Sequence, residues 1–121
     1  MKDNVIVDKS FAFAVRIMKF YKVLINRKQY VLGKQILRSG TSIGANVREA
    51  HNSESDADFI HKLSISKKEA DETRYWLELL KESEYINATE FKSLHSDATE
   101  LLKIITSIIV TMKNKKVKPV F

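Results

Sequence analysis

Four segments of this chain repeat apolar residues at alternating steps of three and four, the period of one face of an α-helix. The clearest row runs through Phe91, Leu94, Ala98, Leu101, Ile105, Ile108 and Met112. Only 3 glycines and 1 proline occur in 121 residues, too few for the tight turns of a sandwich or barrel. The pattern predicts four helices, at residues 8–27, 30–51, 56–83 and 87–114.

Short polar connectors separate the four segments, so consecutive helices are expected to run in opposite directions. Asp8 is a candidate cap for the first helix. Ser55 with Asp58, and Asn87 with Glu90, have the spacing of capping boxes for the third and fourth. The sequence therefore predicts an all-α, antiparallel up-and-down four-helix bundle. It forms a single domain over residues 1–121, with a basic tail at 113–121.

All the glycines, Gly33, Gly40 and Gly44, lie in the second segment, although each costs a helix about 1 kcal/mol relative to alanine. Gly40 and Gly44 are four residues apart and so lie on one side of the helix. We expect a neighbouring helix to approach closely there. The alternative is a kink or break at Ser39 and Gly40.

The first segment has two apolar rows instead of one. The first row consists of Phe13, Ile17, Phe20 and Leu24, and the second of Phe11, Ala14, Met18, Tyr21 and Ile25. Together they form an apolar face wider than one neighbouring helix covers. A single bundle would leave part of this face in water, which favours a homo-oligomer.

Polar residues interrupt the apolar rows of the second and third segments. The candidates for a structural polar network are Arg38, Asn46, Glu49, Glu69 and Glu72. We expect Arg38 and Asn46 to face Glu69 and Glu72 and to fix the register of the two helices, as a polar residue does in a coiled-coil seam. The alternative is that Glu69 and Glu72 form a catalytic acid–base pair.

The net charge of +6 is unevenly distributed along the chain. Lys and Arg outnumber Asp and Glu by ten to three in residues 1–50 and by five to none in residues 101–121, whereas acids outnumber bases by twelve to six in between. This distribution has two interpretations: oppositely charged helices attract one another within or between subunits, or the basic part contacts a polyanion. The candidate nucleic-acid-binding residues are Arg16, Lys19, Lys22, Arg27, Lys28 and Lys34.

Two adjacent aromatic residues, Tyr75 and Trp76, have two interpretations. They form either a platform on which nucleic-acid bases stack or a part of the core or of a subunit contact.

Other classes of site are not indicated. Cysteine is absent, so there is no disulfide and no thiol nucleophile. His51, His61 and His95 lack the paired Glu-x-x-His spacing of a di-iron bundle, and no phosphate-binding loop occurs. We expect no catalytic residue, no metal and no cofactor, and therefore no enzyme activity. Neither a secretion signal nor an apolar stretch of membrane-spanning length is visible, which predicts a soluble cytoplasmic protein.

The run from Gln35 to Ala50, QILRSGTSIGANVREA, resembles the signature of the 23S rRNA intervening-sequence protein family. Residues 58–66, followed by Glu69, Glu72 and Trp76, resemble the second block of that family. The resemblance implies a four-helix bundle in a ring-shaped homo-oligomer, a pentamer, as in the similar accessory proteins of diversity-generating retroelements. Those relatives bind nucleic acid and a reverse transcriptase through basic surfaces.

These observations lead to a functional hypothesis. The chain is expected to be a non-enzymatic, oligomeric adaptor that binds RNA or DNA electrostatically. One alternative is a protein–protein interaction module without nucleic-acid binding. The other is an enzyme that uses Glu69 and Glu72.

Overall fold

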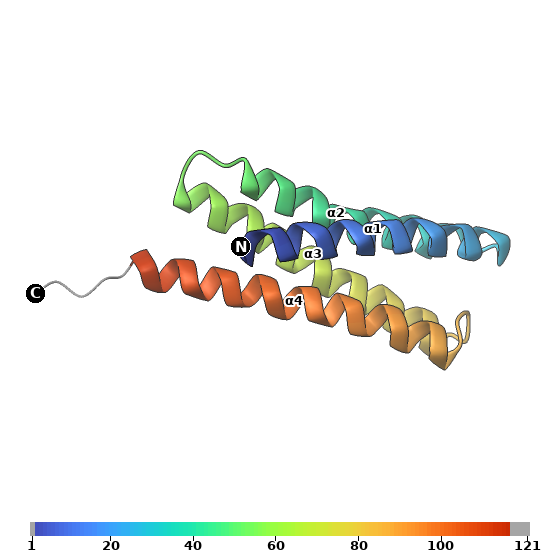
Figure 1. Cartoon of the computed structure of the whole chain (residues 1–121). Helices are drawn as coiled ribbons and strands as arrows, with labels where there is room; N and C mark the ends of the chain where they lie inside the picture. Colours follow the sequence, from blue (N-terminus) through green and yellow to red (C-terminus); the bar gives the residue numbers. More distant parts are fainter. Residues whose placement is uncertain (1, 117–121) are drawn as a thin grey trace, which may run out of the picture.

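The structure, a computed structural model, describes residues 2–116, with side chains for residues 5–115. Four helices follow one another along the chain: α1 (Lys2–Asn26), α2 (Tyr30–His51), α3 (Asp56–Glu82) and α4 (Ala88–Lys116). They alternate in direction and form an elongated bundle, with the α1–α2 and α3–α4 turns at one end and the α2–α3 connector at the other (Figure 1). The predicted all-α four-helix bundle is confirmed.

The first helix begins earlier than the sequence predicts. Asp8 lies inside α1, not at its cap, because the apolar face continues toward the N-terminus. Ile6 is buried in the core, and Ser10 is buried against α2. Burial of Ile6 stabilises a part of the helix that no capping residue marks. At the other end of the chain, α4 continues to Lys116, and residues 117–121 of the predicted basic tail lie outside the described residues.

Both predicted capping motifs start a helix, the first through one hydrogen bond and the second through a reciprocal pair. The Ser55 hydroxyl accepts a hydrogen bond from the backbone N–H of Asp58 at 3.0 Å. Asn87 and Glu90 satisfy each other's backbone N–H groups, at 2.8 and 3.0 Å. These bonds pair amide groups that the first helical turn leaves without partners.

The turns after α1 and α3 share one backbone geometry. Lys28 and Glu84 have φ angles of 61° and 63°, in the left-handed region. In each turn the backbone N–H of the next residue donates to the carbonyl of the residue five positions earlier. Gln29 donates to Leu24 at 2.8 Å, and Tyr85 donates to Leu80 at 2.9 Å. This is the Schellman arrangement, which usually has glycine where these two charged residues lie.

Close approach between α1 and α2 explains Gly40 and Gly44. α2 is continuous from Tyr30 to His51, so the alternative of a break at Ser39 and Gly40 is wrong. A Cβ atom at Gly40 would lie 2.7 Å from Cγ1 of the fully buried Ile17, and one at Gly44 would lie 3.2 Å from the Ser10 carbonyl oxygen. Alanine would therefore hold these two helices apart.

We predict that substitution by alanine has opposite effects on stability at Gly40 and at Gly33. Gly40→Ala should lower the free energy of unfolding by about 1–2 kcal/mol, because the collision with Ile17 outweighs the gain in helix propensity. At Gly33 a Cβ atom meets only ordinary contacts at 3.6 Å, so Gly33→Ala should raise it by up to about 1 kcal/mol. Urea denaturation of both variants measures the difference, and equal effects would contradict the close-packing explanation.

Candidate functional site

The arginines of the predicted nucleic-acid-binding set point toward α4. Arg16 forms an ion pair with Asp97 and donates to the Ser93 hydroxyl at 2.8 Å. Arg27 donates to both carboxylate oxygens of Glu90, at 3.0 and 2.8 Å. Lys9 adds a third pair, 3.1 Å from Glu100. This α1–α4 seam neutralises basic side chains that the sequence had suggested for a polyanion.

The Arg27 contact includes the turn that precedes α4. One guanidinium nitrogen also donates to the Tyr85 carbonyl at 3.0 Å. Hydrogen bonding from Arg27 holds the pKa of Glu90 below its ordinary value, although burial opposes the shift, and the same bond raises the pKa of Arg27. The acidic partners lie at 90, 97 and 100, with Ser93 between them, which is the spacing of one helix face. This spacing is the signal that the sequence analysis missed.

The four lysines of the set differ from the arginines. Lys19, Lys22, Lys28 and Lys34 are exposed and form no ion pair with any residue in the described part of the chain. They belong to the C-terminal half of α1, the α1–α2 turn and the start of α2. They are the members of the predicted set that the fold leaves available to a ligand.

The second apolar row of α1 is only partly covered. The first row is buried, from Phe13 at 2% exposure to Leu24 at 0%. In contrast, Phe11 is 59% exposed and Met18 55%, and Val15 between them is also exposed. We call Phe11, Val15 and Met18 the α1 ridge. Phe11 also lines a groove of about 670 Å³ formed by α1, α2 and the start of α3.

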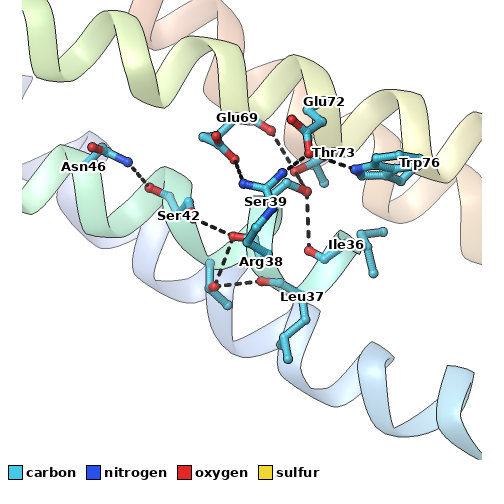
Figure 2. A network of polar contacts seen from close by, with 11 residues as sticks. Ile36, Leu37, Arg38, Ser39, Ser42, Asn46, Glu69, Glu72, Thr73 and Trp76 are labelled. Atoms are coloured by element: carbon cyan, nitrogen blue, oxygen red, sulfur yellow. Dashed lines mark hydrogen bonds and ion pairs between the residues drawn. The ribbon is translucent and has the colours of Figure 1, made fainter. Parts of the chain in front are cut away.

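Arg38 lies between the two carboxylates that the sequence assigned to it. It donates to Glu69 at 2.9 Å and forms an ion pair with Glu72, which also accepts from the indole N–H of Trp76 at 3.0 Å (Figure 2). The Arg38 side chain is about half exposed, whereas that of Glu69 is 17% exposed. One guanidinium thus connects both carboxylates of α3 to α2, an arrangement that fits a structural network.

Asn46 and Glu49 do not take part in this network. Asn46 donates to the Ser42 carbonyl within α2 at 2.9 Å, so the prediction that it faces Glu69 and Glu72 is wrong (Figure 2). Glu49 accepts from Lys62 of α3 at 2.9 Å, a contact that raises the pKa of Lys62. Asn46 and Glu49 lie about two and three turns along α2 from Arg38, beyond the reach of its carboxylate partners.

Buried hydroxyl groups join α2 and α3 beneath the ion pairs. The Thr73 hydroxyl lies 2.9 Å from that of Ser39, and Ser66 donates to the Ile43 carbonyl at 2.9 Å. Ser39, Ser66 and Thr73 are all fully buried. Their small side chains allow the helices to pack closely while keeping the hydroxyls hydrogen-bonded. The sequence analysis did not assign this role to any of the three.

The two adjacent aromatic residues have different environments. Trp76 packs against the core and is hydrogen-bonded to Glu72. Tyr75 is 53% exposed, and its ring meets that of Trp76 edge-on at 5.2 Å. Of the two, only Tyr75 has a ring largely accessible to solvent.

Neither metal ligation nor membrane insertion gains support from the described residues. Within them, His, Asp and Glu form no group of three or more that would hold a metal ion. His95 lies 2.9 Å from Glu78 and stacks on Phe91 at 4.7 Å between ring centroids. Among the described helices, none combines the length and the apolar character needed to cross a membrane.

The Arg38 network predicts a measurable loss of stability. Arg38→Ala should lower the free energy of unfolding by about 1 kcal/mol, because it leaves the mostly buried Glu69 without its cation. Arg48→Ala is the matched control, since Arg48 is exposed on the same helix and forms no ion pair within the described residues. An Arg38→Ala variant with an unchanged melting temperature would show that the network adds nothing to stability.

Comparisons with known proteins agree with this architecture. The sequence model of the 23S rRNA-intervening sequence protein family matches residues 2–107. A crystal structure of a protein with unknown function from the S23 ribosomal protein family of Bacteroides thetaiotaomicron is 58% identical, with a TM-score of 0.88. The match covers 90% of this chain and 98% of that one. A search of curated proteins found no match. The chain belongs to the 23S rRNA-intervening sequence protein family.

Proposed function

We propose that this protein is a non-enzymatic, self-associating adaptor. The observation that carries the proposal is the α1 ridge, where Phe11 and Met18 are each more than half exposed. Large apolar side chains at helical spacing favour contact with another apolar surface over contact with water. A second copy of the chain supplies the same ridge. The family resemblance adds a ring, a pentamer, as the expected form of the assembly.

A second proposed activity is electrostatic binding of RNA or DNA. It is supported by the exposed lysines of α1 and the α1–α2 turn, Lys19, Lys22 and Lys28, together with Lys34 of α2. These side chains have no competing acidic partner among the described residues, so phosphate groups would be free to contact them. The α1 ridge occupies the middle of α1, and the lysines follow it toward the α1–α2 turn, with Lys19 and Lys22 one helical turn beyond Val15 and Met18.

Self-association predicts a particle mass that is a multiple of 14.0 kDa in light scattering. A variant carrying Phe11→Glu and Met18→Glu should run near 14.0 kDa, because charges at the centre of an apolar contact oppose its burial. Val110→Glu places the same charge at an exposed apolar position of α4 and should leave the mass unchanged. A wild-type protein that is monomeric at all concentrations would overturn the proposal.

Polyanion binding predicts that retention on immobilised RNA falls as salt rises. Reversing both Lys19 and Lys22 to glutamate should weaken retention. It should also reduce the slope of log affinity against log salt concentration by roughly one to two, the loss of about two phosphate contacts. The control reverses Lys92 and Lys103, two exposed lysines of α4. Arg16 and Arg27 are unsuitable targets because their removal would open the α1–α4 seam. If retention depends neither on salt concentration nor on the charges of Lys19 and Lys22, the alternative of a protein–protein interaction module without nucleic-acid binding is favoured.

A further inference from the structure

A second basic surface lies on the opposite pair of helices. A groove of about 830 Å³ runs between α3 and α4. Lys67 and Lys68 line it from α3, and Lys113 lines it from the C-terminal part of α4. Leu102 and the buried Ile109 give it apolar lining from α4. The sequence analysis assigned no role to Lys67 and Lys68, whereas Lys113 belongs to the predicted basic tail.

The groove carries an excess of unpaired positive charge. Its two acidic residues already have cationic partners, because Asp71 lies 3.3 Å from Arg74 and Glu72 is paired with Arg38. Lys67, Lys68 and Lys113 are exposed and have no acidic partner among residues 5–115. A bound anion would therefore meet three ammonium groups whose charge the fold does not neutralise.

The same groove presents an aromatic ring. Tyr75 lines it and is 53% exposed, one of the large apolar or aromatic side chains that the bundle leaves uncovered. Its neighbour Trp76, which Tyr75 meets edge-on, is fixed by the hydrogen bond to Glu72 (Figure 2). A ring supported in this way loses little freedom when a flat ligand stacks on it.

We infer that the α3–α4 groove binds a single-stranded nucleic acid, with Tyr75 stacking on a base and Lys67, Lys68 and Lys113 contacting phosphates. Lysines beside an exposed aromatic ring are the combination that single strands require, whereas the bases of a duplex are stacked on one another and unavailable. An acidic peptide would use the lysines but has no need of the ring. The inference extends the proposed polyanion binding to a surface that does not include the α1 lysines, so the two can fail separately.

Fluorescence anisotropy with a labelled single-stranded oligouridylate, on the full chain, tests the inference. Tyr75→Ala should weaken binding about 5-fold to 100-fold, the loss of one stacked base, and Tyr75→Phe should retain it. Tyr30→Ala is the matched control, since Tyr30 is a similarly exposed tyrosine at the start of α2. Substituting Lys67 and Lys68 by alanine should reduce the salt dependence, while Lys92→Ala should not. Circular dichroism verifies the fold of each variant.

The outcomes separate the two binding surfaces. The proposal that the groove binds a single strand is overturned if the Tyr75→Ala variant keeps wild-type affinity, or if single strand and duplex bind with equal affinity. If polyglutamate binds as tightly as the oligouridylate and its binding also depends on Tyr75, the ligand of the groove is an acidic peptide and the inference is overturned. If reversal of Lys19 and Lys22 alone abolishes RNA binding, the groove is wrong and the α1 site stands. If Tyr75→Ala weakens RNA binding and reversal of Lys19 and Lys22 does not, the groove is supported and the α1 site is overturned.

Discussion

The bundle depends on how closely α2 approaches the helices on its two sides. Toward α1 it presents Gly40 and Gly44, where even a methyl group would be crowded. Toward α3 it presents Ser39, whose buried hydroxyl meets Thr73, and the Ile43 carbonyl, which accepts from Ser66. Dispersion contacts strengthen steeply at short separation, and small residues make such separations possible. The helix that is weakest in intrinsic propensity therefore has extensive contact with two neighbours.

Part of the uneven charge of the sequence is neutralised inside the molecule. Basic side chains of α1 face acidic side chains of α4 in three ion pairs, and α2 and α3 are joined by the pairs of Arg38 and Glu49. Such half-exposed pairs contribute little energy individually. Their clearer effect is to select the partner and register of each helix. The lysines of the two surfaces for which we propose ligands lie outside these pairs.

Periodicity and spacing were sufficient to predict the bundle, two capping boxes and the contact of Arg38 with Glu69 and Glu72. They failed where the outcome depended on which helix lies beside which face. A period of 3.6 residues assigns Arg16 and Arg27 to a polar strip, but it does not reveal that the strip borders an acidic face of α4. Likewise, Asn46 occupies a plausible seam position, yet its amide reaches only its own helix. The early start of α1 has no local signal because tertiary burial stabilises it.

The seam between α1 and α4 has a consequence for the order in which the molecule opens. Its ion pairs join residues that are 63 to 91 positions apart, whereas the helix pairs that follow one another along the chain are connected by short turns. Bringing distant segments together costs more chain entropy and makes such contacts late in folding. The α1–α4 contact is also the smallest of the four between helices. We therefore expect local opening to begin at the α1–α4 seam, favoured by the ionic strength that weakens its ion pairs.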